Sequence, residues 1–439
     1  MINKIQIKET PKNLQEKLNE WKSYGAVSTP KEIVDLMIDL AGINPPKNKT
    51  FSILEPACGV CNFLLSLRTK LKKGKIEFYG VEFNKEVFSQ ILYLNREEQR
   101  FNLINEDFLL WQTEKKFDLI IGNPPYGIIG DETHYRISSL KDRKDYYKRN
   151  YCTWKGKYNT YGAFIEKSIR LLKDKGKLVF IVPATWMILD EFAELRKFLS
   201  QNGKTKVYYL GKKIFKGVEV TSCIIIFEKG KKGMELYYSP YKNLSVFVLN
   251  TSIRNWNGSI ITFSNSLTDK MEKGFLKIDD LFEIKISARS PELRTFPFKS
   301  EVKTKCSDLP VLNGKNLKKG LIIRENQTGF WIDKEKVTLL KEFYGKIPRI
   351  IVGHTKGGKI VAAIEDKIYP YVGDVYHLLP KEKMDIKELE NIVEWLNSRE
   401  IEEYLNILYK EITPHITKTQ LKLVPLQIKN AAIKNNCLF

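Results

Sequence analysis

The sequence predicts an α/β fold: a doubly wound, mostly parallel, Rossmann-like sheet, followed by a β-rich domain that ends in a helical part. From residue 50 to about residue 230, short apolar runs alternate with amphipathic stretches, as strands alternate with crossover helices. After about residue 245, helical periodicity becomes sparse and Asn-Gly, Ser-Pro and Gly-Gly pairs interrupt short mixed segments. Because 439 residues exceed the usual size of one core, we expect two domains, residues 1–245 and residues 246–439.

Short apolar runs between turn residues are the expected strands of the first domain, at residues 51–54, 78–81, 103–104, 118–121, 177–182, 207–209 and 223–227. Residues 30–40 are typical of a helix with Pro30 at its first position and Thr29 as its N-cap. Residues 163–172 predict a second amphipathic helix. In the second domain a clear helical pattern returns only from Asp385 to about Lys410.

The composition favours a polyanionic partner. The formal net charge is +21 and the pI is about 9.4, an excess of Lys and Arg that suits nucleic acid, although a lysine-rich solvated surface has the same composition. Six cysteines are few for this length, and no signal peptide or apolar run of the roughly 20 residues that span a bilayer is present. We expect a cytoplasmic protein with free thiols.

A candidate cofactor site lies where the expected strands end. A small-residue turn, residues 55–59, follows the first strand directly, and alone it is a weak signal. Acids then end the next strands: Glu82 follows residues 78–81, and Asp107 lies just past residues 103–104. Such carboxylates can accept the ribose hydroxyls and the adenine amine of a nucleoside, and Phe83 and Phe108 beside them can stack on the purine.

The cofactor expected from these residues is S-adenosylmethionine. A dinucleotide would need a Gly-x-Gly-x-x-Gly turn for its pyrophosphate, and the sequence has none, so the nucleoside here should lack phosphates. Thr29 and the preceding residues 25–28 could close over the methionine end of the cofactor. We expect no metal.

The most specific string is residues 117–126, an apolar strand that runs into Asn123, Pro124, Pro125 and Tyr126. Two prolines remove two backbone donors, so the Asn123 side-chain oxygen and the Pro124 carbonyl can both accept from an exocyclic NH₂ group. The lone pair of an aromatic amine is delocalised, and two such bonds pull it toward a nucleophilic geometry. Positioning and charge placement then supply most of the catalysis.

A base within a duplex cannot reach such a pocket, so the target must flip out and stack between aromatic rings. Tyr126 supplies one ring. Phe215, between the expected strands 207–209 and 223–227, is a candidate for the second, although core packing explains its position equally well.

These residues resemble the adenine-N6 DNA methyltransferases, specifically the TaqI-like, gamma-class group of type II restriction–modification systems. The resemblance runs from about Gly25 to Leu426. In the first half the matching strings are Thr-Pro (29–30), Glu-Pro-Ala-Cys (55–58), Gly-Val-Glu (80–82), Asp-Phe-Leu-Leu-Trp (107–111), Asn-Pro-Pro-Tyr-Gly (123–127), Thr-Trp-Lys-Gly-Lys-Tyr-Asn (153–159), Tyr-Gly-Ala-Phe (161–164), Val-Pro-Ala-Thr-Trp (182–186) and Val-Tyr-Tyr-Leu-Gly (207–211).

The resemblance implies roles for individual residues. It places cofactor contacts at Thr29, Glu55, Ala57, Glu82, Phe83, Asp107, Phe108 and Pro125, with Phe164 opposite Phe83 around the cofactor's adenine. It makes Asn123, Pro124 and Tyr126 the catalytic set and Phe215 the second ring on the flipped base. One departure concerns the cofactor turn: Cys61, followed by Asn62, stands where the family has its second glycine.

The second half resembles the target-recognition domain of the same family, in residues 288–292, 310–318, 354–357, 377–381, 395–398 and 414–417. This implies the palindrome TCGA, methylated on its adenine, and places Pro414 in the gap that the displaced base leaves. Lys356 lies in a run that nearly matches a phosphate loop, but Ile360 replaces the required hydroxyl, so a contact with the DNA backbone or a plain solvated turn is expected there.

Two further signals are weaker. Cys58 and Cys61 form a C-x-x-C without a second pair at zinc spacing, so small buried thiols are the better interpretation. The stretch from Lys141 to Lys157 interleaves basic and aromatic residues, as a nucleic-acid surface or a solvated face would, and its position after the Asn-Pro-Pro-Tyr string favours a lip of the DNA cleft.

Together these residues predict a site-specific adenine-N6 DNA methyltransferase. Its partner is double-stranded DNA; we expect a monomer, paired in function with a cognate restriction endonuclease but not bound to it. Cytosine-N4 methylation is the nearest alternative, since only pocket shape separates the two bases. Methylation of a protein glutamine at N5 uses the same tetrapeptide but needs no large basic recognition domain, and a non-catalytic specificity subunit would not need these side chains intact.

Overall fold

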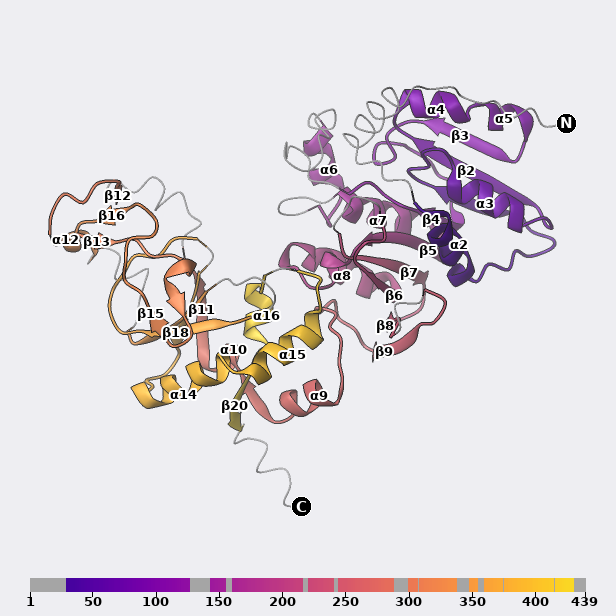
Figure 1. Cartoon of the computed structure of the whole chain (residues 1–439). Coiled ribbons are helices and arrows are strands. Elements are labelled where there is room, and N and C mark those ends of the chain that lie inside the picture. Colours follow the sequence, from indigo (N-terminus) through magenta and orange to yellow (C-terminus); the bar gives the residue numbers. More distant parts are fainter. Residues whose placement is uncertain are drawn as a thin grey trace, which may run out of the picture. The chain divides into compact units, whose positions relative to one another are not determined.

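The computed structural model describes residues 29–126, 143–154, 160–215, 220–240, 244–287, 299–306, 308–337, 347–353, 359–373, 375–413 and 415–429. The chain divides into two compact units, Met1–Ile261 and Thr262–Phe439 (Figure 1). Within the described residues, no helix combines the length and the apolar character that crossing a bilayer requires.

The first unit is built on one nine-stranded sheet with the order β3-β2-β1-β4-β5-β7-β6-β8-β9. From β3 to β5 all neighbours are parallel, whereas β7 is antiparallel to both β5 and β6. The strands are β1 (Phe51–Glu55), β2 (Ile76–Glu82), β3 (Phe101–Asn105), β4 (Phe117–Gly122), β5 (Leu172–Pro183), β6 (Gly203–Gly211), β7 (Ser222–Lys229), β8 (Met234–Tyr238) and β9 (Val248–Ile253). The mostly parallel α/β sheet predicted from the sequence is confirmed.

Helices pack on this sheet because each buries one apolar stripe. They are α2 (Lys31–Ala41), α3 (Asn62–Lys70), α4 (Lys85–Ile91), α5 (Tyr93–Glu97), α6 (Lys144–Asn150), α7 (Thr160–Leu171) and α8 (Ala193–Asn202), with short 3₁₀ turns at η2 (Ala184–Met187) and η3 (Asp190–Phe192). Helix α2 packs against α3 and β5, and α7 packs against β5 and α8. The strands lie between these helices, so β7 is buried along almost its whole length and β5 is buried from Leu178 to its end.

Strands β1 and β4 form the topological switch point of the sheet. The chain runs outward from β1 through β2 to β3, and then returns to pair β4 with the other side of β1. Parallel strands end at the same edge of a sheet, and ligands of open α/β folds bind at that edge beside the switch point. The turn after β1 and the Asn123–Tyr126 segment after β4 therefore start from neighbouring strand ends.

The start of α2 differs from the sequence prediction. Pro30 is its N-cap, with φ −56° and ψ 144°, and no side chain caps the helix. Thr29 is not the N-cap because its hydroxyl Oγ1 accepts a hydrogen bond of 3.1 Å from Asn123 Nδ2. The helix ends at Gly42, whose φ of 55° is a left-handed conformation that suits glycine.

The second unit carries a four-stranded antiparallel sheet, β11-β19-β17-β18, and three smaller sheets. Its strands are β10 (Phe275–Lys277), β11 (Phe282–Ile286), β12 (Lys299–Ser300), β13 (Leu309–Pro310), β14 (Leu317–Lys318), β15 (Leu321–Ile322), β16 (Trp331–Ile332), β17 (Arg349–Gly353), β18 (Val361–Glu365), β19 (Val375–Pro380) and β20 (Pro425–Lys429). Its helices are α9 (Ser266–Glu272), α10 (Ile278–Leu281), η4 (Gly314–Asn316), α12 (Lys334–Val337), α14 (Ile386–Leu396), α15 (Arg399–Tyr409) and α16 (Lys418–Lys422). The β-rich unit with a helical end matches the prediction.

The helical pattern from Asp385 to Lys410 proves to be two helices, α14 and α15, instead of one. Asp385 caps α14 in a capping box with Glu388. Ser398 then caps α15 by accepting from the backbone N–H of Ile401. Periodicity alone missed this break because the apolar face continues across it.

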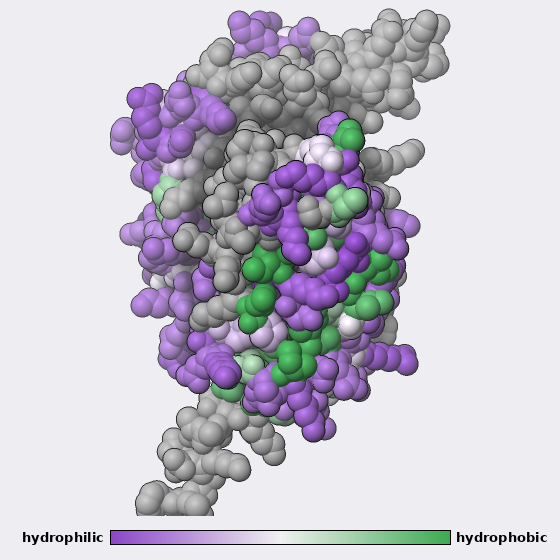
Figure 2. Space-filling view, turned by 90° about the vertical axis from the view of Figure 1, so that its left-hand side faces the viewer, coloured by the Kyte–Doolittle hydropathy of each residue, from purple (hydrophilic) through white to green (hydrophobic). Residues whose placement is uncertain are grey.

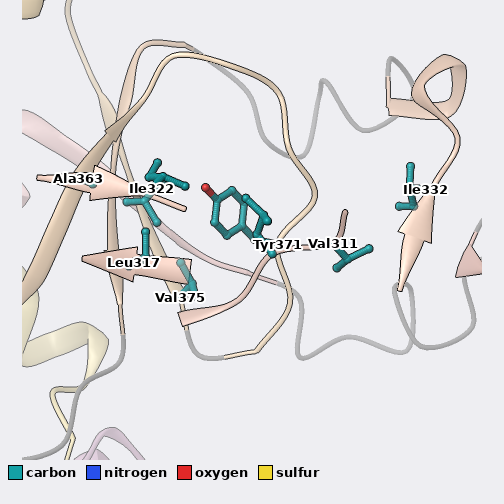
Figure 3. Close-up of a cluster of buried hydrophobic side chains, with 9 residues drawn as sticks. Val311, Leu317, Ile322, Ile332, Ala363, Tyr371 and Val375 are labelled. Atoms are coloured by element: carbon teal, nitrogen blue, oxygen red, sulfur yellow. The ribbon is translucent and has the colours of Figure 1, made fainter. Parts of the chain in front are cut away.

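Tyr371 lies at the centre of an apolar core cluster in this unit, among Val311, Leu317, Ile322, Ile332, Ala363 and Val375 (Figure 3). Its ring is fully buried, and its hydroxyl donates a 2.5 Å hydrogen bond to Glu365 Oε2. Arg324 holds the other carboxylate oxygen of Glu365 at 2.8 Å. The buried charge of Glu365 therefore has both partners that a buried carboxylate needs.

A buried hydrogen-bond network joins β17, β19 and the residue that follows β11. Arg349 Nε donates to His377 Nδ1 at 3.2 Å, and Ser287 Oγ lies 2.5 Å from His377 Nε2. Arginine cannot accept a hydrogen bond, so Nδ1 carries the lone pair and Nε2 carries the proton. Burial and the Arg349 charge hold the pKa of His377 well below its usual range, which keeps the ring neutral. Ser287 therefore accepts from this ring and is not activated by it.

The surface is mostly hydrophilic on the face that faces the viewer in Figure 2. On the face that Figure 2 shows, most of the coloured residues are hydrophilic, and apolar residues form islands between them. Over the whole sequence, Lys and Arg number 73 against 52 Asp and Glu.

Strand β9 lies past the boundary expected at residues 245–246 and pairs with β8, so residues 248–253 belong to the sheet of the first unit.

Gly203, at the start of β6, should not tolerate a side chain. A Cβ there would lie 2.4 Å from Phe227 Cζ and 2.6 Å from the Glu228 carbonyl oxygen. We expect Gly203→Ala to destabilise the protein by about 1–3 kcal/mol through overpacking. In Gly162→Ala, within α7, the new Cβ meets Thr153 at an ordinary 3.6 Å, so the helix should gain roughly 0.5–1 kcal/mol. Thermal denaturation of both variants tests this, and equal shifts would contradict the packing.

Candidate active site

The turn after β1 is held against the end of β2 by backbone hydrogen bonds. Cys58 N–H donates to the Val81 carbonyl at 3.0 Å, and Gly59 N–H donates to Glu82 Oε2 at 2.8 Å. Gly80 makes this approach possible, because a Cβ on it would lie 2.7 Å from Leu103 Cδ2 and 3.0 Å from Cys58 Sγ. The small residues expected to admit a ligand thus also let the turn lie on the neighbouring strand.

Cys61 has the left-handed conformation of a glycine, with φ 62° and ψ 34°, as N-cap of α3. For a residue with a Cβ this costs about 1–2 kcal/mol. Its N–H closes the turn by donating to the Cys58 carbonyl at 2.7 Å. Cys61, a fully buried residue, therefore adopts a backbone conformation that glycine takes without this cost.

Glu55 ends β1 and points into the start of α3. Its Oε2 accepts from the Leu64 N–H at 3.3 Å, and the Phe63 N–H also donates to this carboxyl group. The first N–H groups of a helix have no partner within the helix, so Glu55 supplies one. Burial raises the pKa of Glu55 well above its usual range. Ala57, the other expected cofactor contact in this turn, is half-buried.

Glu82 is the last residue of β2, at the strand end where the sequence predicts it. Its Oε1 accepts from Asn84 N–H at 2.7 Å, and its Oε2 accepts from Gly59 N–H. Burial raises the pKa of Glu82, although these backbone hydrogen bonds counteract the shift. A carboxylate has room for further donors, because each oxygen offers two lone pairs. Glu82 is thus held in place and can still accept hydrogen bonds from the two hydroxyls of a diol.

Asp107 lies just past β3 and is nearly buried. Its Oδ1 accepts from the Leu109 N–H at 2.9 Å. Its Oδ2 accepts from Arg143 Nη1 at 2.8 Å and from the Tyr147 hydroxyl. Arg143 and Tyr147 lie 36 and 40 residues from Asp107 along the chain, in a stretch expected at the surface, so no local pattern predicts this contact.

The expected adenine-binding rings have different neighbours. The Arg143 guanidinium lies over the Phe83 ring, 5.1 Å from its centroid. Phe108 packs against Phe164 with centroids 5.1 Å apart, and Lys167 Nζ lies 5.1 Å from the Phe108 ring. Burial lowers the pKa of Lys167 to about 8. Phe164 therefore packs on the expected cofactor ring Phe108. Phe83 follows the expected cofactor acid Glu82 and is covered by Arg143.

The segment after β4 is tied to both neighbouring elements. Asn123 donates through Nδ2 to Thr29, which directs the amide oxygen the other way. The Pro125 carbonyl accepts from Thr160 Oγ1 at 2.7 Å, at the first residue of α7. Pro124 is buried, and its ring, like that of Pro125, restricts the backbone. The structure therefore brings Thr29, Asn123 and Pro125 together from three separate parts of the chain.

Tyr126 and Phe215 are in contact. Their ring centroids are 6.3 Å apart and their planes meet at 71°, and both side chains are buried. The Tyr126 hydroxyl donates to the Ile181 carbonyl at 2.9 Å, which anchors this ring on β5. The planes of the two rings must become nearly parallel if a base is to stack on both at once, which requires Phe215 to turn or withdraw.

The basic and aromatic stretch contributes mainly buried rings within its described part. Tyr147, Tyr151 and Trp154 are buried, while Lys148 and Arg149 are exposed. The rings therefore do not form the exposed stacking surface that interleaving suggested. Glu166 of α7 holds the stretch by accepting from the N–H groups of Cys152 and Thr153.

Three residues expected to contact DNA, Lys157, Lys356 and Pro414, lie outside the described residues. Among the residues that are described, no three His, Cys, Asp or Glu side chains come together as a metal site would require. Cys58 and Cys61 are both buried free thiols, and their mutual hydrogen bond and burial raise the pKa of Cys58.

Two protein-family models match the chain in the regions where these features lie. The Eco57I restriction-modification methylase model matches residues 50–215, which contain the turn, both acids and the Asn123–Tyr126 segment. The TaqI-like C-terminal specificity domain model matches residues 309–426, in the second unit.

Known relatives extend this similarity to almost the whole chain. The chain is 42% identical over 406 residues to the type II methyltransferase M.TthHB8I of Thermus thermophilus, an alignment that covers 92% of this chain and 91% of the relative. It is 33% identical over 211 residues to the type II methyltransferase M.HincII of Haemophilus influenzae, covering 48% of this chain and 38% of that one.

A solved structure shares the fold. The nuclease-deletion mutant of the Type ISP restriction-modification enzyme LlaGI, in complex with a DNA substrate mimic, aligns with a TM-score of 0.54 at 15% identity. The alignment covers 96% of this chain and 48% of that chain.

The raised pKa of Glu55 predicts how stability changes with pH. Above about pH 4.5 the unfolded chain ionises this carboxyl group more readily than the folded protein does, so its contribution to stability falls as pH rises toward the folded pKa. Glu55→Gln keeps an acceptor and cannot ionise, so from pH 5 to pH 8 its melting temperature should rise relative to that of the unmodified protein.

Glu77→Gln is the matched control. Lys115 lowers the pKa of Glu77, so the stabilisation from this carboxylate is complete above about pH 5 and is lost only on acidification. Its melting temperature should keep a constant offset between pH 5 and pH 8. A constant offset for Glu55→Gln as well would refute the buried, protonated state.

Proposed function

This chain belongs to the type II DNA methyltransferases of restriction–modification systems, and we propose that it transfers a methyl group from S-adenosylmethionine to N6 of adenine. The substrate is a flipped-out adenine in duplex DNA, in the sequence TCGA. The observation that carries the proposal is the Asn123–Tyr126 segment at the end of β4, held by Thr29 and Thr160 beside the switch point.

The residues at the strand ends fit this cofactor by their chemistry. Glu82 can accept a ribose diol while its backbone partners hold it, and Asp107 can accept an amine. Phe83 and Phe108 adjoin these acids, and Phe164 packs on Phe108. Thr29, Glu55, Ala57 and Pro125 complete the proposed cofactor set. When bound, the cofactor supplies an electrophilic methyl group on sulfonium, and this set requires no metal.

Asn123 and Pro124 prepare the nucleophile. The Asn123 side-chain oxygen and the Pro124 carbonyl accept the two hydrogens of the exocyclic amine, which draws its lone pair out of conjugation. The Asn123–Thr29 hydrogen bond matters here because it sets which end of the amide faces the base. These fixed acceptors also stabilise the positive charge that develops on the amine during transfer.

Tyr126 and Phe215 hold the flipped base. Tyr126 is fixed by its bond to Ile181, so Phe215 is the ring that adjusts. Unstacking a base costs a few kcal/mol, and stacking on these two rings offsets part of that cost. This pairing agrees with the roles that the family resemblance implies.

The second unit is proposed to read the duplex, with Lys157, Lys356 and Pro414 among the DNA contacts. Its match to a TaqI-like specificity domain supports this role. The net charge of +21 supports a DNA partner, because phosphate contacts supply much of the affinity of such proteins. We propose that the enzyme acts as a monomer in the cytoplasm and that a separate cognate endonuclease cuts the same sequence.

The base and the sequence are tested together by nucleoside analysis. The protein is incubated with tritiated S-adenosylmethionine and duplex oligonucleotides that contain or lack TCGA. We expect label in N6-methyladenine, only in the duplex that contains TCGA. Label in N4-methylcytosine would overturn the choice of base, label in protein would overturn the DNA substrate, and equal label in both duplexes would overturn the sequence.

Asn123→Ala tests the acceptor role. Losing one preorganised hydrogen-bonding group of this kind lowers kcat by about 10²–10³-fold. Single-turnover methylation of the TCGA duplex should show this loss, while cofactor binding, measured by equilibrium dialysis, should persist. Asn202→Ala removes an exposed amide at the end of α8 and should leave both measurements unchanged. A kcat within threefold of the unmodified enzyme would exclude Asn123 as an essential acceptor.

A further inference from the structure

Arg143 contacts two groups of the proposed cofactor site at once. Its Nη1 donates to Asp107 Oδ2 at 2.8 Å, and its guanidinium carbon lies 5.1 Å from the centroid of the Phe83 ring. Asp107 comes after β3, Phe83 comes after β2, and Arg143 is the N-cap residue of α6. One side chain thus spans the ends of two neighbouring strands.

This contact is stronger than an ordinary surface ion pair. The Asp107 side chain is only 8% exposed, and that of Arg143 is 34% exposed. A charge-assisted hydrogen bond in such a place is less screened than one in water, and the cation over Phe83 adds to it. Tyr147, one turn along α6, donates to the same carboxylate oxygen and supports the arrangement.

Arg143 makes the same two kinds of contact that an adenine ring would make here. A guanidinium is planar, offers N–H donors in its plane and stacks on aromatic faces. Adenine likewise offers an amine in its plane and stacks through its faces. Under the proposed function, on which this inference rests, Asp107 and Phe83 are the partners of the cofactor's adenine. An adenine that bonds to Asp107 Oδ2 and stacks on the Phe83 face that Arg143 covers would displace the guanidinium.

We propose that Arg143 is a built-in competitor for the cofactor's adenine subsite and that cofactor binding releases it toward DNA. In the structure, Arg143 pairs with Asp107 and covers Phe83. When adenine takes these partners, the guanidinium must leave the carboxylate. It then joins Lys148 and Arg149, which are exposed on the same helix, as a cation available to a phosphate.

The exchange couples the two substrates. The apparent affinity for cofactor is reduced by the fraction of molecules in which Arg143 occupies the subsite. DNA that binds the released guanidinium lowers that fraction, and by linkage the cofactor strengthens DNA binding to the same extent. Arg143 is therefore a positioning residue for substrate order and takes no part in methyl transfer.

The first test measures cofactor-site binding without any reaction. Equilibrium dialysis with tritiated S-adenosylhomocysteine, which has no methyl group to transfer, compares the unmodified protein with Arg143→Ala. We expect the variant to bind about tenfold more tightly, because removing the competitor leaves Asp107 and Phe83 accessible. Unchanged or weaker binding would overturn the proposal, since Arg143 would then be neutral or a cofactor ligand.

Arg100→Ala is the matched control. Arg100 also pairs with a carboxylate, Glu98, and its guanidinium lies 5.6 Å from the centroid of the Phe78 ring, but neither partner belongs to the proposed cofactor site. Affinity for S-adenosylhomocysteine should be unchanged in this variant. A gain equal to that of Arg143→Ala would show that loss of any such arginine raises the affinity, and would also overturn the proposal.

The second test measures release toward DNA. DNA affinity is determined at several salt concentrations, with and without saturating S-adenosylhomocysteine. One additional phosphate contact makes the slope of log K against log salt steeper by about 0.9. We expect this change in the unmodified protein and not in Arg143→Ala, and an unchanged slope in both would refute the release to DNA. If the unmodified protein fails to bind S-adenosylhomocysteine at all, the proposed function itself fails, a result distinct from each of these.

Discussion

The parallel pairing of β1 with β2 on one side and β4 on the other is the constraint on which the site depends. It places the ends of three strands at one edge, so residues far apart in the chain become neighbours. The same pairing requires a residue without a side chain at Gly80, because the turn after β1 must lie directly on the end of β2. The positions of the turn after β1, of the acids and of the Asn123–Tyr126 segment all follow from that geometry.

Each polar group of the site is held by a second, structural contact. Glu55 caps α3, Glu82 is fixed by two backbone N–H groups, and Asn123 is held by Thr29. Such contacts reduce the reorganisation needed when ligands bind, which is the main source of electrostatic catalysis. The Arg143–Asp107 pair differs, because the group that satisfies this buried carboxylate is a partly exposed side chain.

Both units use buried charge in the same way. In the second unit Glu365 is matched by Arg324 and Tyr371, and Arg349 bonds to a neutral His377. Unpaired, such groups would cost several kcal/mol each, so they restrict the core to one arrangement of its strands. The TaqI-like specificity domain thus has a core specified by polar contacts as well as by apolar packing.

The sequence by itself determined where the strands of the α/β half lie along the chain, the acids at the strand ends and the Asn123–Tyr126 segment, because these depend on periodicity, turn residues and local spacing. It also determined the β-rich second half. Only the tertiary structure decided that Thr29 accepts a hydrogen bond from Asn123 and that Pro30 is the N-cap of α2. It also decided that α14 and α15 are separate helices and that the Tyr147 and Tyr151 side chains are buried. It likewise placed Arg143 on Asp107 and Phe83, since contacts across 36 or more residues depend on how packed elements meet and leave no local pattern.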